Sequence, residues 1–216
     1  MGIYIIVAII AYAIGSISFS VIIGKKMAGV DVREKGSGNA GTTNVLRNIG
    51  KRAAALTLLC DILKGVVAIL LAILIGKLNS DTNSAILVQI AAIFVIVGHT
   101  FPIFFGFKGG KGVATSLGVL LLINWKIGLI CLVFGVILIA LTQMVSLGSI
   151  ASAILFPVLT IFINECYIIP GNYIIFSIII CIFVAYNHRS NIKRLLNGTE
   201  NKISFKKKAQ EWNKWC

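Results

Sequence analysis

Charged side chains are scarce in this sequence. Asp, Glu, Lys and Arg make up 12% of its 216 residues, whereas about a quarter is typical of a soluble domain. Hydrophobic residues make up 58%, and the mean hydropathy is +0.97. Because so few charges cannot cover a water-facing surface, the composition excludes an ordinary soluble enzyme, a disordered chain and a secreted disulfide module. It predicts an integral membrane protein.

Acids, histidines and cysteines are few as well. Seven acids, two histidines and five cysteines are dispersed without a CxxC pair or another ligand spacing, so we expect no metal site and no cofactor. The cysteines lie mostly in apolar runs and are interpreted as reduced packing residues. Neither His99 nor His188 has an acid five residues later, which excludes the H-x4-D dyad of thioester-dependent acyltransferases. Asp61 stands alone, whereas a CDP-alcohol transferase needs several aspartates on one helix.

Apolar runs long enough to cross a bilayer occupy most of the chain. We expect an all-α, polytopic membrane helix bundle in which residues 1–216 form a single domain. Seven spans are predicted, at residues 2–24, 53–76, 82–107, 112–125, 127–164 (two spans with a turn near 143–148) and 166–187. The run at 112–125 is short for a crossing, and a tilted or re-entrant helix is the alternative there.

Basic residues are distributed unevenly between the two sides of such a bundle. With seven spans, seventeen Lys and Arg residues fall on one side and two on the other. Because positive residues resist translocation, the basic side is predicted to be cytoplasmic, with the N-terminus outside and a basic cytoplasmic tail from about residue 188. Topology and attraction to anionic lipid headgroups then explain much of the net charge of +13, so we do not expect nucleic acid as a partner.

The first cytoplasmic segment is rich in glycine and small donors. Residues 36–47 read GSGNAGTTNVLR. The glycines allow turns that expose successive N–H groups, and the side chains add donors and one fixed cation, which suits a phosphate. The alternative is a flexible solvated connector. The candidate phosphate ligands are Ser37, Gly38, Asn39, Thr43, Asn44 and Arg47.

The second segment, residues 98–115, reads GHTFPIFFGFKGGKGVAT. It departs from the spacing of a Walker A loop, so nucleotide hydrolysis is not supported. Its glycines permit close backbone approach, Lys111 supplies charge, and the helix that follows offers N-terminal N–H groups to an anion. Snorkelling to the interface is the alternative for the two lysines, and it fits Lys108 better. The candidate ligands are Lys108, Gly109, Gly110, Lys111 and Gly112.

The third segment directly follows the last span. Residues 188–200 read HRSNIKRLLNGTE. His188 and Asn191 are three residues apart, so they share one helix face at the membrane boundary and can address a bound hydroxyl together. Ordinary hydrogen bonding of an interfacial histidine is an equal alternative. Glu200 is interpreted as orienting an Arg or Lys.

Two ionisable residues interrupt one apolar run. Asp61 and Lys64 lie on one helix face and can neutralise each other, which relieves a cost of about 2.5 to 3.5 kcal/mol per unpaired charge. The alternative function is a membrane transporter or channel for phosphorylated metabolites, because glycine-interrupted helices and cationic loops also line anion paths. Transport would need a site reachable from both faces, and the chain shows neither internal repeats nor a charged path.

Together the three segments resemble the motifs of the bacterial acyl-phosphate-dependent glycerol-3-phosphate acyltransferases, a family of small polytopic inner-membrane enzymes. The motifs cover about a fifth of the chain, and D-I-L-K-G at 61–65 and G-S-I at 15–17 also fit. The chain has Ser18 where relatives often have proline, and it carries an extra basic tail after Lys202. Neither departure touches the expected chemistry.

The resemblance implies transfer of a fatty acyl group from acyl phosphate to the 1-hydroxyl of sn-glycerol 3-phosphate. The products are lysophosphatidic acid and inorganic phosphate, and the reaction is the first acylation of membrane phospholipid synthesis. The expected localisation is a multi-pass cell membrane protein with its active site at the cytoplasmic face. The expected partners are both substrates and the lipid bilayer, and docking of a soluble acyl-phosphate-producing enzyme is left open.

The resemblance also implies roles for individual residues. Catalytic roles fall to Ser37, Arg47, His188 and Asn191. Substrate and phosphate binding falls to the remaining candidates of the first two segments and to Ser149. Structural support falls to Asp61, Lys64, His99 and Glu200. The acceptor of the hydroxyl proton is either His188 or a phosphate oxygen of a substrate.

Overall fold

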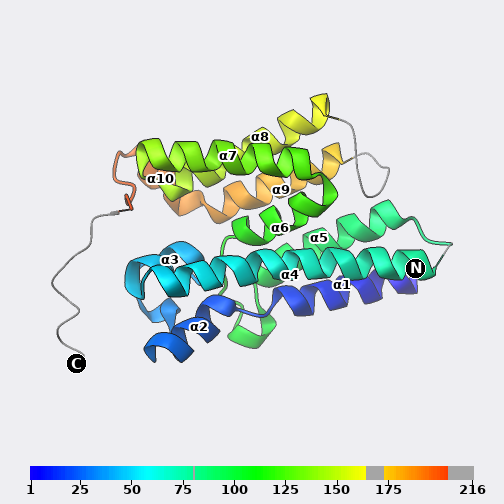
Figure 1. Ribbon diagram of the computed structural model, residues 1–216, viewed down its shortest axis with the longest axis horizontal. Helices are drawn as coiled ribbons and strands as arrows, with labels where there is room; N and C mark the ends of the chain where they lie inside the picture. Colours follow the sequence, from blue (N-terminus) through cyan, green and yellow to red (C-terminus); the bar gives the residue numbers. More distant parts are fainter. Residues whose placement is uncertain (80, 164–172, 204–216) are drawn as a thin grey trace.

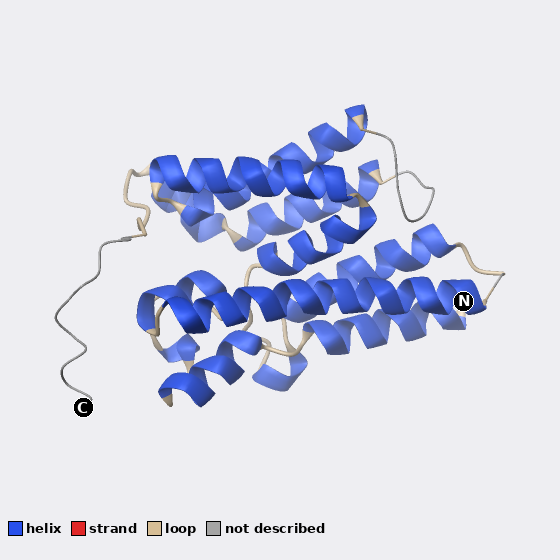
Figure 2. Ribbon diagram, in the orientation of Figure 1, coloured by secondary structure: helices blue, strands red, loops and turns tan. Residues whose placement is uncertain are grey.

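The computed structural model describes residues 1–79, 81–163 and 173–203, and within these ranges the chain forms helices and no strands (Figures 1 and 2). The all-α prediction is confirmed. The α-helices are α1 (Gly2–Gly15), α2 (Phe19–Ala28), α3 (Thr42–Asn48), α4 (Lys51–Leu78), α5 (Ser84–Thr100), α6 (Val113–Ile123), α7 (Trp125–Thr142), α8 (Val145–Phe162), α9 (Ile174–Asn187) and α10 (Arg189–Leu196). Two short 3-10 helices, η1 (Val32–Glu34) and η2 (Ile103–Phe105), lie in loops.

The long helices pack in two groups. In Figure 1, α1, α4 and α5 run side by side, α7, α8 and α9 form a second group, and α6 lies between the groups. The helices α2, α3 and α10 gather at one end, and α1 begins at the other. A continuous apolar core joins both groups through α6, with Ile69, Leu87, Ile96 and Ile127 among its most buried side chains. This arrangement brings the loops at one end of the bundle together.

The number of membrane-spanning helices can be compared with the seven predicted spans by helix length and composition. Among the residues that the structure describes, five segments are long and apolar enough to cross a membrane: Gly2–Ala28, Lys51–Leu78, Ser84–Phe105, Trp125–Thr142 and Val145–Phe162. Helices α9 and α10 count as a sixth if this pair, bent by 66°, is one span. Helix α6 rises only about 16 Å, which is short against a hydrocarbon core of about 30 Å. A multi-pass fold is confirmed, whereas seven spans remains a prediction, and part of the predicted span 166–187 lies outside the described residues.

The first span is interrupted, although its sequence predicts one continuous helix. Helix α1 ends at Gly15 and α2 begins at Phe19. Two carbonyl oxygens at the interruption accept hydrogen bonds from the ammonium group of Lys64 in α4, Gly15 at 3.0 Å and Ile17 at 2.8 Å. A break inside a membrane needs such partners, because lipid offers none to the backbone.

Two glycines allow the helices around this break to pack closely. A Cβ atom on Gly15 would lie 2.2 Å from the carbonyl oxygen of Val95 in α5, and one on Gly98 would lie 2.3 Å from that of Tyr12 in α1. Helices α1 and α5 therefore touch backbone to backbone. The close contact fixes the end of α5, from which the second motif begins.

Candidate functional site

The three polar segments meet at one end of the bundle. The N–H of Ala40 in the first segment donates to the carbonyl of Gly109 in the second at 3.2 Å. The ammonium group of Lys111 donates to the side-chain oxygen of Asn191 in α10. The guanidinium group of Arg47 in α3 donates to the carbonyl of Asn201 at 3.0 Å. Residues far apart in the sequence thus form one polar site, as expected if the motifs share a single site.

Asn44 organises the first segment from within, and its expected role as a phosphate ligand stays a prediction. Its side-chain NH2 group donates to the carbonyls of Val32, Lys35 and Asn39 at 2.8 to 3.1 Å. Its oxygen accepts the N–H of Ser37 at 3.1 Å, and the residue is 3% exposed. Because its donors already bind backbone oxygens, Asn44 shapes the loop that presents Ser37. The side chain of Ser37 is exposed, and Thr43 is half-buried.

The second segment folds back on the end of α5 to form a glycine cradle, defined here as residues 109–112. The N–H groups of Gly109 and Gly110 donate to the carbonyls of Thr100 and His99, both at 3.1 Å. Gly112 has a φ of +87°, which favours glycine, and it is the residue from which α6 starts. The first turn of α6 therefore points its free N–H groups toward this end of the bundle. Lys108 is exposed, which is compatible with the alternative role of anchoring the helix end at the membrane interface.

Lys111 is the cation at the centre of the site. Its pKa is lowered to about 8, chiefly by burial and also by neighbouring Arg194 and Arg47, whereas Glu200 opposes the shift. Partial burial is also the main cause that lowers the pKa of the Arg47 guanidinium. These four groups comprise three cations and one acid. The site accordingly carries a positive field that favours a multiply charged anion.

The third segment is held by Glu200. Its carboxylate accepts the side-chain NH2 of Asn191 at 2.9 Å and the Nε–H of Arg194 at 3.1 Å. The Asn191 amide is thereby oriented with its oxygen toward Lys111. Glu200 thus pairs with an arginine in this structure, and its supporting role stays a prediction. His188 is 3% exposed, and its Nδ1 lies 2.8 Å from the carbonyl of Val184.

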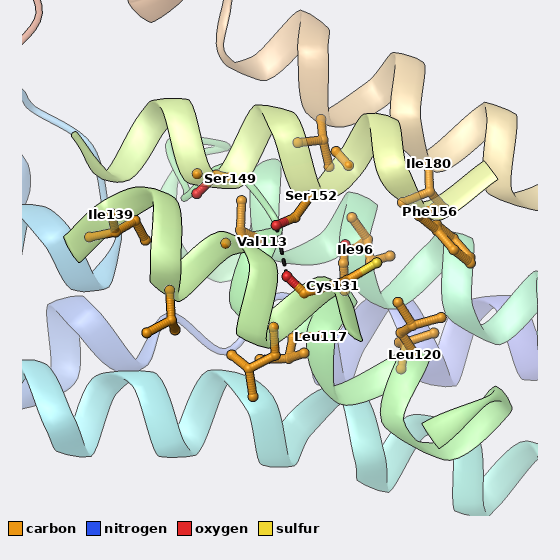
Figure 3. A pocket seen from close by; sticks show the side chains of 18 of the residues that line it. Ile96, Val113, Leu117, Leu120, Cys131, Ile139, Ser149, Ser152, Phe156 and Ile180 are labelled. Carbon is orange, nitrogen blue, oxygen red and sulfur yellow. Dashed lines mark hydrogen bonds between the residues drawn. The ribbon is translucent and has the colours of Figure 1, made fainter. Parts of the chain in front are cut away.

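An apolar pocket opens beside this polar site (Figure 3). The empty space between α5, α6, α7, α8 and α9 amounts to about 780 Å³, part of which is open to the surroundings. Val113, next to the cradle, and Val184, the hydrogen-bond partner of His188, both line it. The pocket and the polar site are therefore neighbours, as a ligand with a charged head and an apolar tail requires.

Few polar side chains line the pocket. Ser149, a predicted ligand, lies on its wall, and Ser152 donates to the carbonyl of Cys131 at 2.8 Å (Figure 3). Sequence reasoning missed Ser116, which also lines the pocket, in the first turn of α6. Its buried hydroxyl has no hydrogen-bond partner within the described part of the chain. Its position one residue beyond the second motif is the signal that was available.

Three of the four expected support residues, Asp61, Lys64 and His99, lie together beneath the cradle. Asp61 and Lys64 form an ion pair at 3.0 Å, and Nδ1 of His99 lies 3.5 Å from the same Asp61 oxygen. All three side chains are at least nine-tenths buried. The mutual neutralisation of Asp61 and Lys64 predicted from their spacing is present in the structure.

Fold and site together define a multi-pass membrane protein with a cationic polar site beside an apolar pocket at one end of its helix bundle. Comparison with known proteins makes the assignment more specific. Residues 5–198 match the sequence profile of a family described as glycerol-3-phosphate acyltransferase. The enzyme of that description from Clostridioides difficile (strain 630) is 49% identical over 94% of this chain and 97% of its own length. The one from Halalkalibacterium halodurans is 43% identical over 92% and 95%.

Two solved structures are similar as well. The crystal structures of PlsY (YgiH), an integral membrane glycerol 3-phosphate acyltransferase, are 36% identical to this chain and cover 93% of it. The TM-score is 0.81 for the glycerol 3-phosphate form and 0.79 for the lysophosphatidic acid form, over 96% and 95% of those chains. The chain belongs to the glycerol-3-phosphate acyltransferase family. It is an acyltransferase, and the resemblance drawn from its motifs is confirmed.

Proposed function

We propose that the protein transfers a fatty acyl group from acyl phosphate to the 1-hydroxyl of sn-glycerol 3-phosphate at the cytoplasmic face of the membrane. The products are lysophosphatidic acid and inorganic phosphate. Support comes from the relatives' glycerol 3-phosphate and lysophosphatidic acid forms. The single observation that carries the proposal is the convergence of Arg47, Lys111 and the glycine cradle beside an apolar pocket.

The reaction needs little more than placement and charge. The hydroxyl oxygen forms a bond to the acyl carbonyl carbon, the bond from that carbon to the phosphate oxygen breaks, and the hydroxyl proton leaves with the phosphate, directly or through His188. Acyl phosphate is already activated, so the gain comes from orienting the hydroxyl and stabilising charge on the leaving phosphate. Arg47, Lys111 and the N–H groups in the first turn of α6 are the proposed phosphate ligands. Gly109 and Gly110, whose own N–H groups bind carbonyls at the end of α5, are proposed to let the phosphate approach the backbone.

The remaining roles follow from position. Ser37 and the His188 and Asn191 pair are proposed to contact the reacting hydroxyl and the glycerol backbone. The apolar pocket takes the acyl chain, with Ser149 on its wall. Further candidates for the phosphate site are proposed on the first two segments: Gly38, Asn39, Thr43, Asn44 and Lys108. The basic side of the bundle is proposed as the place where a soluble acyl-phosphate-producing enzyme docks.

The experiment offers purified protein labelled glycerol 3-phosphate with one acyl donor at a time. Acyl phosphate alone, in the presence of chelator, is expected to give lysophosphatidic acid, because the motifs contain neither a Walker loop nor a metal-ligand spacing. Acyl-CoA and acyl-carrier protein serve as the competing donors. Equal or faster turnover with either of them, or loss of activity in chelator, contradicts the proposed donor.

A further inference from the structure

Three ionisable side chains lie buried at the level of the apolar band. The exposed leucines on α4, from Leu56 to Leu78, mark the stretch of that helix that faces lipid. Asp61 lies five residues inside Leu56, which is about 7.5 Å along the helix axis. Charges at such a depth are costly and are retained mainly where they serve a site or a partner. The role of the Asp61, Lys64 and His99 cluster therefore requires an explanation beyond packing.

One side of the cluster supports the break in the first span. Lys64 donates to the carbonyls of Gly15 and Ile17, and it pairs with Asp61. These contacts explain why the Lys64 ammonium group is buried and how its charge is balanced by Asp61. They do not account for the histidine, which adds a third ionisable group to a pair that is already balanced.

The other side of the cluster reaches the glycine cradle. The main-chain oxygen of His99 accepts the N–H of Gly110 at 3.1 Å. A Cβ atom on Gly110 would lie 2.1 Å from Nε2 and 2.8 Å from Cε1 of the His99 ring. The outer edge of the imidazole thus lies directly against Gly110, the residue before Lys111.

The two edges of the ring have different contacts. Nδ1 lies 3.5 Å from the Asp61 carboxylate, and Nε2 lies against the cradle. A ring held at one edge by a buried charge has little freedom to move away from the segment at its other edge. Asp61 therefore fixes where the ring lies, and the ring limits how close Gly110 can approach α5.

We propose that His99 is a positioning residue for the glycine cradle, held by Asp61 and acting on substrate through the placement of Gly110 and Lys111. The inference rests on the proposed function, because it assigns the cradle to a phosphorylated substrate. A merely structural histidine would change the amount of folded protein without changing KM. A positioning residue changes KM for a phosphorylated substrate in protein that is folded.

Two conservative variants separate the two edges of the ring. His99→Asn keeps a polar group near the Nδ1 position, which faces Asp61, and removes the Nε2 edge. His99→Gln keeps a polar group near the Nε2 position, which faces Gly110, and removes the Nδ1 edge. Both variants are purified, tested for folding by thermal unfolding, and measured for kcat and KM with each substrate.

Each variant is then combined with Gly110→Ala. In the wild-type background the added methyl group meets Nε2, and we expect kcat/KM to fall by about 100-fold, as for a misplacement of about 1 Å. In the His99→Asn background the methyl group has more room, so the further loss should be about tenfold smaller, since residues in contact couple by this order. A contact of 3.0 Å to the Ala40 carbonyl remains and accounts for a residual loss. In the His99→Gln background, Gly110→Ala should lower kcat/KM by the same factor as in the wild-type background.

Gly109→Ala is the matched control. Its Cβ would meet the main-chain oxygens of His99 and Thr100 at 2.0 and 2.7 Å, and neither oxygen is removed by changing the side chain of His99. Its effect on kcat/KM should therefore be the same in all three backgrounds.

The outcomes distinguish this proposal from the function on which it rests. A wild-type protein that forms no lysophosphatidic acid from acyl phosphate refutes the proposed function. An active wild type in which Gly110→Ala costs the same in the His99→Asn and His99→Gln backgrounds refutes only the positioning role of His99. His99→Asn protein that fails to fold while His99→Gln protein folds also refutes that role, because the Nε2 edge would then serve folding rather than the placement of the cradle.

Discussion

Lys111 combines two properties that a phosphate-binding cation needs. It is buried enough that its pKa falls to about 8, and it is held by the Asn191 oxygen in a defined place. A buried cation interacts more strongly with an anion than an exposed one does, because less water screens it. The same burial makes its charge sensitive to pH in the range where enzymes are assayed.

We predict an alkaline decline in activity that belongs to Lys111. An amine is charged below its pKa, so the cation is lost as the pH rises through about 8. The value of kcat/KM, which reports groups of the free enzyme, should fall above that pH by up to about tenfold per pH unit. A guanidinium group stays charged up to about pH 12, so Lys111→Arg should remove this decline even if it lowers activity. An unchanged decline in the Arg variant would assign it to another group.

Arg47 offers a planar fork of donors that lysine does not reproduce. One guanidinium nitrogen binds the Asn201 carbonyl, which leaves the others for a substrate. Arg47→Lys should lower kcat/KM by about 10- to 100-fold, corresponding to about 1.5 to 3 kcal/mol for a hydrogen bond to a charged group. Arg52→Lys, an exposed site at the start of α4, is the control and should change little. Equal effects at the two positions would show that Arg47 serves only the surface charge.

Individual residues also show where sequence reasoning stops. Asn44 and Arg47 lie in one short helix, and their donor chemistry predicts the same task for both. The two side chains differ in burial: Asn44 is buried against the loop that it organises, whereas Arg47 is exposed. No local pattern gives the inward direction of Asn44, since its partners include Val32, twelve residues earlier.

At the scale of helices, the apolar runs in the sequence predict well that a helix is present and predict less well where it begins and ends. The runs at 53–76 and 127–164 become α4 and the pair α7 and α8, with the turn at Gln143 inside the expected 143–148. The break between α1 and α2 has no signal within its own run. Its partner, Lys64, lies 47 residues away from Ile17, so only the tertiary structure shows it.

Helix α6 is short, packs against longer neighbours and starts from the cradle. It contacts α4 closely, and a Cβ atom on Gly118 would lie 2.1 Å from the carbonyl oxygen of Ile62. A side chain at 118 would therefore push α6 away from α4. The wall of the apolar pocket, which includes Leu117 and Val119, would move with it.

We predict that Gly118→Val destabilises the fold and reduces activity together. Overpacking a close contact costs about 1 to 3 kcal/mol, and the backbone contact here leaves little room for relaxation. The measurements are the unfolding temperature in detergent and kcat/KM at a temperature where the variant remains folded. Gly2→Ala, where an added Cβ would meet nothing within 4 Å, is the control. A lower unfolding temperature with an unchanged kcat/KM would show that the packing of α6 does not affect the site.

For the whole molecule, the site depends on both groups of helices at once. Arg47 and the cradle come from elements next to the α1, α4 and α5 group, whereas Asn191 lies in α10 and the pocket walls come mostly from α6, α7, α8 and α9. The sequence predicts that its three motifs share one side of the membrane, because the basic residues lie there. It does not predict which side chains touch, since those contacts join segments about 80 to 150 residues apart.

The last prediction concerns the orientation of the entire chain in the membrane. Single cysteines are introduced at exposed positions in a background without native cysteines, and intact cells are treated with a reagent that does not cross the membrane. Lys108→Cys lies in the second segment, Lys35→Cys directly before the first and Lys202→Cys directly after the third. All three should react only after the cells are opened. Asp81→Cys, in the loop between α4 and α5 at the opposite end, should react in intact cells. Because one site is built from all three segments, they must share a compartment, so labelling of any one of them from outside would contradict the proposed cytoplasmic site.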